Sequence, residues 1–326
     1  MAEARGIGAA EENVLIRVGS CSVTILPHLG GKIASIRVSG HELLQAPLAA
    51  YAPRTRTMPF AASDASGWDE CLPSVAPCTV ETADGPVNIP DHGDIWRVVW
   101  QPVARSANSA TFRGECFSLP LALERTVTLT ETGKGWQLSL DYTVTNTGGY
   151  PAPWSWAAHS LFVAEAGDRI ILPSSIRELL LEGGVGDRLG KAGALVAWPI
   201  ATLANGSQTD LSVAQPPESG TGDKLFAGPL SESENWCALE RPQAGVRIRV
   251  SFDPAATPYL GLWACYGGWP ERPGPKQVCV ALEPATALVD SLAKIGPWSR
   301  VLAPGESFSW PMNVEFESIQ GVDRHA

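Results

Sequence analysis

Residues 122–146 read ALERTVTLTETGKGWQLSLDYTVTN, and this stretch decides the fold. Val127 and Leu129 alternate with threonines in its first half, and apolar and polar residues alternate over 138–144 in its second half. Alternation of this kind is typical of a strand with one buried face. The intervening Thr-Gly-Lys-Gly at 132–135 is typical of a hairpin turn. The stretch therefore predicts an antiparallel hairpin whose apolar face packs on a core.

Short strand-like segments continue on both sides of this hairpin. The 32 glycines and 27 prolines are spread along the 326 residues, which indicates many short elements, and no long amphipathic helix is evident. We therefore predict an all-β fold, a large antiparallel β-sandwich formed by one domain over residues 1–326, with residues 1–12 flexible. The expected strands are residues 14–18, 22–26, 33–38, 96–103, 110–116, 246–252, 259–266, 278–282 and 307–316.

Composition argues against several classes of function. The net charge of −10 and the pI near 5.0 disfavour nucleic acid and anionic membrane surfaces as partners. No apolar run approaches the roughly 18 residues that span a bilayer, and residues 1–12 are too polar for a signal peptide. The 7 cysteines include no CxxC pair, which indicates reduced thiols rather than disulfides. We expect a cytoplasmic protein that does not bind a membrane.

A carboxylate follows a second apolar stretch, VCVALEPAT at residues 278–286. The run 278–282 predicts a buried strand, and Pro284 predicts its end because proline cannot donate to a sheet ladder. Glu283 between them is costly to bury unless it is paired or has a function. It is therefore either a satisfied ion pair or cap, or a general base at the floor of a cleft.

Two histidines are the candidate partners of Glu283. His92 lies in the Gly-containing loop IPDHG, and His159 has apolar residues on both sides. Taken alone, each also fits a turn or a core position. No two of the 5 histidines have metal-ligand spacing, and no HExxH or GxSxG motif is present, so we expect no metal site and no α/β-hydrolase nucleophile.

Two loops carry further candidates. The sequence GWDECLP at 67–73 places adjacent acids, Asp69 and Glu70, beside Trp68, and predicts a loop that faces either a polar ligand or solvent. Paired with Glu283, either acid could serve a glycosidase, which needs two facing carboxylates. The Gly-rich residues 183–191 lack the spacing of a phosphate-binding loop and are interpreted as an ordinary loop.

The order of several short segments resembles the aldose 1-epimerases (galactose mutarotase-like proteins). The similarity covers nearly the whole chain and is carried by ILPHLGGKIASIRVSGHELL at 25–44, IPDHG at 89–93, NTGGYPAPWSWAAHSLF at 146–162, LGLWACYGG at 260–268, VCVALEP at 278–284 and LAPGESFSW at 302–310.

This resemblance implies a galactose mutarotase-like supersandwich and proton-transfer chemistry on a sugar without a cofactor. It implies Glu283 as general base, His159 as general acid and His92 as a ligand of the reacting centre. The region where the family carries an arginine holds Arg54 and the 67–70 loop here, so Arg54 joins Asp69 and Glu70 as a candidate sugar ligand. Asp223 in GDKLF resembles a sugar-binding aspartate, while Trp68, Trp263 and Trp269 are candidates for stacking on a pyranose.

The expected partner is a small-molecule sugar, and the protein is expected to be a monomer or a homodimer. Two alternatives remain open from the sequence. One is a carbohydrate-binding sandwich without catalysis, and the other is a glycoside-processing enzyme that uses paired carboxylates.

Overall fold

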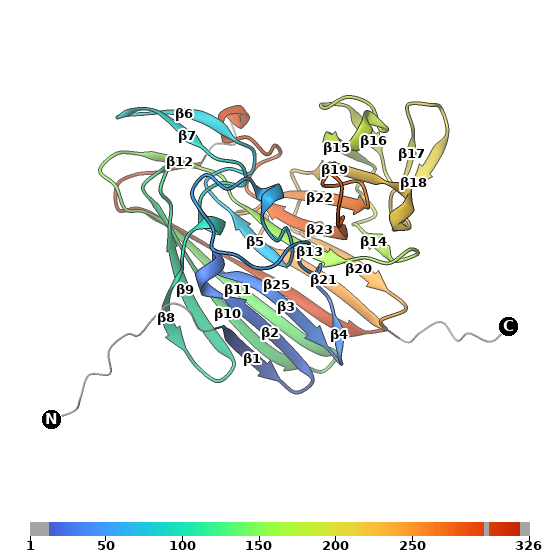
Figure 1. The fold of residues 1–326 in the computed structure, drawn as a ribbon, viewed down its shortest axis with the longest axis horizontal. Coiled ribbons are helices and arrows are strands. Elements are labelled where there is room, and N and C mark those ends of the chain that lie inside the picture. The colour runs from blue at the N-terminus through green and yellow to red at the C-terminus, as the bar shows by residue number, and fades with distance from the viewer. Residues whose placement is uncertain (1–12, 297–299, 320–326) are drawn as a thin grey trace.

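Two antiparallel sheets make up most of the molecule (Figure 1). The computed structural model describes residues 13–296 and 300–319, and the expectation for residues 1–12 lies outside them. In spatial order, the larger sheet contains β1 (Val14–Val18), β2 (Cys21–Leu26), β3 (Lys32–Val38), β5 (Trp68–Cys71), β13 (Ala157–Val163), β23 (Val278–Ala285), β22 (Tyr259–Tyr266), β19 (Thr221–Ala227), β15 (Glu178–Gly184) and β16 (Leu195–Ala197), with β4 (His41–Glu42) beside β3.

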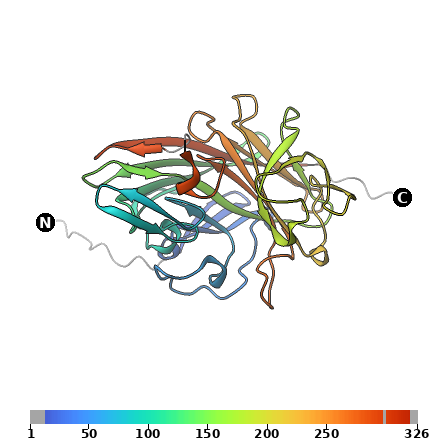
Figure 2. The same ribbon diagram turned by 90° about the horizontal axis from the view of Figure 1, so that it is seen from above.

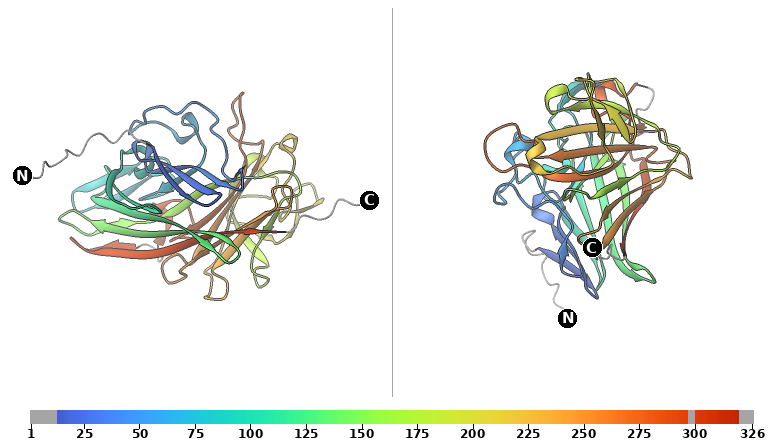
Figure 3. Two further views of the ribbon diagram at one scale, coloured as in Figure 1. Left: turned by 90° about the horizontal axis from the view of Figure 1, so that it is seen from below. Right: turned by 90° about the vertical axis from the view of Figure 1, so that its right-hand side faces the viewer.

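The second sheet faces the first across the core. In spatial order it contains β14 (Arg169–Ile171), β20 (Trp236–Arg241), β21 (Val246–Phe252), β25 (Ser307–Ser318), β11 (Gly135–Asn146), β10 (Leu121–Thr132), β9 (Ser109–Glu115) and β8 (Gln101–Arg105). The other views show its long green strands β10 and β11 beside the red β25 (Figures 2 and 3). These strands form one all-β sandwich, as the sequence predicts.

Short elements complete the described chain. Three two-stranded ribbons are β6 (Cys78–Thr82) with β7 (Gly85–Ile89), β12 (Ala152–Trp154) with β24 (Arg300–Leu302), and β17 (Ile200–Thr202) with β18 (Gln208–Asp210). The helices in the described residues are single 3₁₀ turns: η1 (Pro27–Leu29), η2 (Phe60–Ala62), η3 (Ile95–Arg97), η4 (Val185–Asp187), η5 (Pro217–Ser219) and η6 (Leu292–Lys294). Nowhere in residues 13–296 and 300–319 is a helix long and apolar enough to cross a membrane.

The predicted hairpin is present as β10 and β11. Its strands pair from Leu121 opposite Asn146 to Thr132 opposite Gly135, and β25 pairs along the other edge of β11. Gly135 has φ +148°, and a Cβ there would collide with the carbonyl of Phe316, so the close approach of β25 requires glycine. The apolar positions of both strands are buried against the larger sheet. Alternation in the sequence therefore sets the inner face of this sheet.

The predicted 67–73 loop is a strand instead, which corrects the sequence-based expectation. Trp68–Cys71 pairs with β13, and all four residues are buried. Successive strand residues point to opposite faces, so Glu70 points into the core between the sheets, where it contacts Arg125 of β10 and Tyr142 of β11. Asp69 and Glu70 can be buried because each is paired with a cation, and those cations come from distant parts of the chain.

Two further strand boundaries differ from expectation. Pro284 does not end β23, which continues to Ala285 and pairs with β22 throughout. Pairing with β13 on its other edge is interrupted at 282–284, so the missing N–H of Pro284 falls in a gap in that ladder. The expected strand 96–103 begins as the η3 turn, because the N–H groups of Asp94 and Ile95 bond the carbonyl of Leu72, and β8 starts only at Gln101.

The strand order β5-β13-β23-β22-β19 brings distant residues side by side. Asp69 lies opposite His159, and Glu283 lies opposite Gly261. The register of β13 with β23 also sets His159 across from Glu283. Residues that face each other across a ladder share a face of the sheet. One face of the larger sheet thus carries His159 and Glu283, and the opposite face packs on the core.

Candidate functional site

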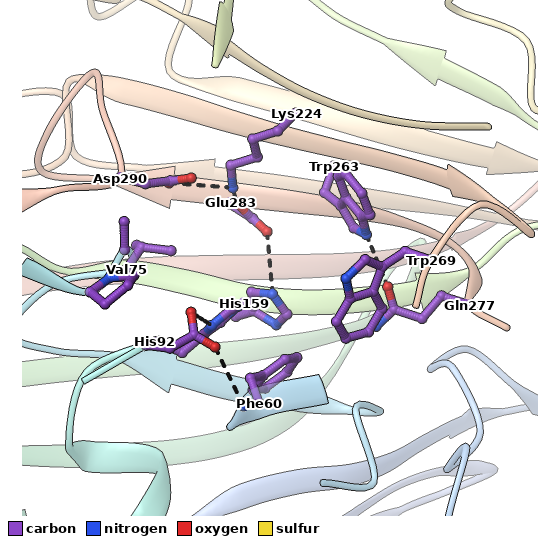
Figure 4. A pocket seen from close by; sticks show the side chains of 13 residues that line it. Phe60, Val75, His92, His159, Lys224, Trp263, Trp269, Gln277, Glu283 and Asp290 are labelled. Atoms are coloured by element: carbon purple, nitrogen blue, oxygen red, sulfur yellow. Dashed lines mark hydrogen bonds and ion pairs between the residues drawn. The ribbon is translucent and has the colours of Figure 1, made fainter. Parts of the chain in front are cut away.

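A cavity of about 230 Å³ lies on the outer face of the larger sheet (Figure 4). Strands β13, β19, β22 and β23 form its floor. Its walls come from η2, from the segment before β6, from the loop after β7 and from the segment before β23. The lining residues are Phe60, Val75, Ala76, Pro77, Asp91, His92, His159, Lys224, Trp263, Trp269, Gln277, Glu283 and Asp290.

Glu283 presents one carboxylate oxygen to the cavity. Its side chain is 2% exposed, and Oε2 accepts a hydrogen bond from Lys224 Nζ. Oε1 has no hydrogen-bond partner in the protein and lies 3.9 Å from His159 Nε2. A buried carboxylate oxygen without a partner is costly. Such an oxygen at the floor of a cavity is available to accept a proton or a hydrogen bond from a ligand.

Burial and charge act on Glu283 in opposite directions. Loss of hydration raises the pKa of Glu283, and the nearby ammonium of Lys224 reduces but does not cancel this effect. Burial alone would lower the pKa of Lys224, but attraction by Asp290 and Glu283 raises it above the ordinary value. Lys224 therefore stays charged at neutral pH, and a carboxylate with a raised pKa is a stronger base than free glutamate.

His159 is the second proton-carrying group on the floor. Burial, and then the charges of His92 and Lys224, lower its pKa well below that of free histidine. Glu283, 3.9 Å away, is already paired with Lys224, and burial therefore keeps His159 neutral at neutral pH. Its Nδ1 has no hydrogen-bond partner.

His92 enters the cavity from a tight turn. It has φ +59°, an uncommon conformation for a residue other than glycine, and its N–H bonds the carbonyl of Val75. Its Nδ1 lies 2.9 Å from Asp91 Oδ1, and its ring stacks on Phe60 at 4.0 Å between centroids. The His159 ring meets it edge-on at 5.1 Å. This geometry fixes the ring and directs Nε2 away from Asp91.

Aromatic rings form the opposite wall. Trp263 donates through Nε1 to Gln277 Oε1 at 3.0 Å, and Gln277 Nε2 donates to the carbonyl of Ala65 at 3.1 Å. These bonds hold the indole in place. Trp269 lies beside it in Figure 4 and contacts Phe60 at 6.2 Å between ring centroids. Indole faces beside polar groups are the usual surface for the apolar face of a sugar ring.

The structure brings some of the predicted residues together and separates others. Glu283, His159, His92, Trp263 and Trp269 line the cavity, and their roles toward a ligand stay predictions. Five other candidates do not line it, which corrects the expectation that they contact the same ligand: Trp68, Asp69, Glu70, Arg54 and Asp223.

Their surroundings explain this. Trp68 and Glu70 point into the core. Asp69 shares the sheet face of His159 but accepts hydrogen bonds from Lys32 and Arg54, and the Arg54 guanidinium also bonds Asp64, so these charges are satisfied among themselves. Asp223 is on the opposite face of β19 and pairs with Arg188.

Neither Asp69 nor Glu70 lines the cavity with Glu283, so the two carboxylate pairs that the sequence suggests for a glycoside-processing enzyme do not form there. The described residues also include no group of three side chains suited to hold a metal ion.

Sequence reasoning missed Lys224, Asp290, Asp91, Phe60 and Gln277. Lys224 is next to the predicted Asp223, and strand alternation admits only one of the two to the cavity. The register decides for Lys224, which lies opposite Trp263. Phe60, Asp290 and Gln277 come from irregular segments for which the sequence contains no periodic signal.

Comparisons with known proteins concern the family and the fold. The family model described as aldose 1-epimerase matches residues 13–315. Among solved structures, the Slr1438 protein from Synechocystis sp. PCC 6803 has a TM-score of 0.70 and 17% identity, covering 98% of this chain and 100% of its own. A galactose mutarotase-like protein from Lactobacillus casei has a TM-score of 0.64 and 17% identity, covering 94% and 100%.

A GalM/aldose epimerase homologue from C. elegans is more distant, with a TM-score of 0.59 and 13% identity over 94% of this chain and 100% of its own. No curated protein matches the sequence. At these identities the solved structures establish the fold.

Proposed function

Because the chain belongs to the aldose 1-epimerase family, we propose that it interconverts the α and β anomers of a free aldose by acid–base ring opening and reclosure. One observation carries the proposal. Glu283 Oε1, buried and without a hydrogen-bond partner, lies 3.9 Å from His159 Nε2 in a cavity whose other wall is aromatic. No cofactor is needed, because the reaction only moves two protons.

The proposed reaction has two coupled proton transfers. Glu283 takes the proton of the C1 hydroxyl, the bond between C1 and the ring oxygen breaks, and protonated His159 gives a proton to the ring oxygen. The C1–C2 bond of the open aldehyde rotates, and the two transfers run in reverse on the other face. We assign to His92, whose ring meets that of His159 edge-on, the role of holding the reacting oxygens by a hydrogen bond.

The pKa shifts support these roles. A raised pKa makes the Glu283 carboxylate a stronger base, and a lowered pKa makes protonated His159 a stronger acid. Each shift also reduces the fraction of enzyme in the active form at a given pH. General acid–base catalysis of this kind contributes about 100- to 10,000-fold.

The charges on the cavity wall favour an uncharged sugar. Lys224 is the only lysine or arginine among the described lining residues, and it already contacts Glu283 and Asp290. Asp91 adds a third carboxylate to the same lining. The substrate class we propose is therefore a neutral aldose, and the free buried thiols support a cytoplasmic site of action.

Anomer exchange measured by saturation-transfer NMR tests the proposal on a panel of neutral aldohexoses and aldopentoses. We expect exchange above the spontaneous rate for at least one sugar, and a loss of about 100-fold or more in Glu283→Gln with an unchanged circular dichroism spectrum. Calorimetric binding of a sugar without faster exchange would instead identify a non-catalytic binding protein. Exchange at the spontaneous rate for every sugar contradicts the proposal.

A further inference from the structure

Lys224 has contacts that the proposed proton transfers do not use. Its ammonium bonds Glu283 Oε2 and lies 3.8 Å from Asp290 Oδ1, and its side chain is 12% exposed at the cavity floor. The ammonium also lies over the Phe226 ring, with Nζ 5.1 Å from the ring centroid. Figure 4 shows Lys224 on the side of Glu283 away from His159. The cation therefore occupies one carboxylate oxygen and leaves the other free.

Asp290 is anchored to the cavity wall. Its backbone carbonyl accepts bonds from the N–H groups of Val75 and Ala76 and from Ser74 Oγ, at 3.0, 2.8 and 3.2 Å. The residues that close one side of the cavity thus also fix the carboxylate that faces Lys224. A chain of contacts runs from the wall at Ser74–Ala76 through Asp290 and Lys224 to Glu283.

We propose that Lys224 is the positioning residue for the general base: it fixes the Glu283 carboxylate so that Oε1 points at the sugar, and Asp290 holds Lys224 in that place. This inference rests on the proposed function and adds two residues to it. Neither residue needs to touch the reacting atoms.

The alternative is an ion pair that only stabilises the fold. Ion pairs of that kind in this protein, such as Arg125 with Glu70, lie in the core between the sheets with every carboxylate oxygen bonded. Here Glu283 keeps Oε1 without a hydrogen bond, Asp290 Oδ1 faces Lys224 at 3.8 Å, and all three residues line the cavity. A structural pair has no reason to leave Glu283 Oε1 unsatisfied beside a cavity.

Any pH experiment must distinguish the effect of Lys224 on Glu283 from the effects of the other ionisable groups around it. Asp290 follows on the chain after β23, His159 comes from β13, His92 from the loop after β7, Cys71 from β5 and Cys279 from β23 itself. Lys224 is the permanent cation among them, and Asp290 opposes its effect on the Glu283 pKa.

Lys224→Met tests the inference, because methionine keeps much of the stem and removes the charge. We expect kcat/KM for the best neutral aldose to fall about 100-fold at neutral pH, the order expected when a catalytic group is misplaced by about 1 Å. The acidic limb of the pH profile should move to higher pH, since the buried carboxylate loses its cation.

Three further variants separate position, charge and general destabilisation. Asp290→Asn should lower kcat by freeing Lys224, and Lys224→Arg should lower kcat while the acidic limb stays where it is in wild type. Lys191→Met is the control, because Lys191 is 85% exposed and pairs only with Asp187. We expect no change in that variant. A Lys224→Met profile with unchanged kcat and an unmoved limb, or a change in KM alone, overturns the inference.

The failure of this inference is distinguishable from failure of the proposed function. If wild type catalyses no exchange, the Glu283 carboxyl can still be followed by ¹³C NMR in protein labelled at glutamate Cδ, with its signal assigned by its loss in Glu283→Gln. Lys224→Met should then titrate at higher pH than wild type, with Lys191→Met unchanged. An identical titration in Lys224→Met and wild type overturns the inference without reference to activity.

Discussion

Two buried glutamates show how surroundings decide the role of a residue. Glu70 and Glu283 are both on strands of the larger sheet, on opposite faces. Glu70 accepts bonds from Arg125, Tyr142 and Trp156, so no oxygen is left for a ligand. Glu283 keeps Oε1 free. The sequence suggests both residues as site candidates. The face of the sheet on which each lies makes Glu70 part of a core ion pair and Glu283 a candidate base.

The core pair yields a prediction about stability. Arg125→Met leaves the carboxylate of Glu70 fully buried without its cation, and breaking a buried pair in this way costs about 3–5 kcal/mol. Urea unfolding followed by tryptophan fluorescence would measure the loss. The double variant Arg125→Met with Glu70→Gln is the control and should recover part of it. A loss below about 1 kcal/mol, the size of a surface pair, would contradict the prediction.

Glu283 yields a prediction about pH. Its carboxylate form is the proposed base, so the contribution of Glu283 to activity is present above its pKa and is lost as the pH falls through it. Burial raises that pKa even though Lys224 opposes the effect. We therefore expect the acidic limb of kcat/KM to lie at higher pH than the titration of an unperturbed glutamate. Exchange rates corrected for spontaneous mutarotation would reveal it, and constant kcat/KM through that range would refute it.

At the scale of elements, β22 makes room for Glu283 by having glycine opposite it. A Cβ on Gly261 would lie 2.9 Å from Glu283 Oε2 and 3.2 Å from Phe226 Cε1. The carboxylate is held by Lys224, so it cannot move without losing that bond. Gly261 pairs along its strand like its neighbours, so glycine is needed there for space and not for its backbone conformation.

Gly261→Ala should therefore lower activity more than stability. We expect kcat to fall about 100-fold, as for other small displacements of a catalytic group, with a cooperative unfolding transition retained. Gly183→Ala is a matched control in the same sheet, because a Cβ on Gly183 would meet no other atom within 4 Å. Equal losses of activity in the two variants, or wild-type kcat in Gly261→Ala, would contradict this account.

Elements also differ in how well the sequence predicts them. The β10–β11 hairpin follows from alternation and a Gly-containing turn, because both signals are local. The sequence predicts a loop where β5 lies, since its acids cannot be buried until Lys32, Arg54 and Arg125 are placed beside them. The sequence also predicts that β23 ends at Pro284. That prediction is wrong because the gap in the ladder that accommodates this proline depends on β13, a distant segment. Errors arise where a distant segment supplies the missing partner.

At the scale of the whole molecule, the site depends on strand order. Strand residues His159 and Glu283 meet because β13 and β23 are neighbours in the sheet, and loop residue His92 joins them through its backbone bond to Val75. Nothing in the spacing of these residues encodes that order, and resemblance to a family supplied it. Resemblance to the family does not point to Lys224 and Asp290. The place of Lys224 depends on the register of β19, and that of Asp290 depends on an irregular segment of this chain.

Charge at the same scale predicts substrate preference. The net charge is −10, and the described lining carries three carboxylates against one lysine. Aldose 6-phosphates and uronic acids should therefore show kcat/KM at least tenfold below that of the matching neutral sugar. The difference should shrink as salt is raised from low concentration to about 0.15 M, where charges are screened beyond about 8 Å. Equal or faster exchange of the phosphate would contradict the prediction.

The cavity joins two kinds of architecture. Glu283 and His159 sit on paired strands, whereas Phe60, Val75 and Trp269 project from irregular segments outside the sheet. Residues of the cavity wall and residues of the sheet can consequently change independently of each other. Substitutions or insertions in those segments can reshape the opening while the proposed catalytic groups keep their places, which makes this scaffold a practical starting point for redesigning selectivity.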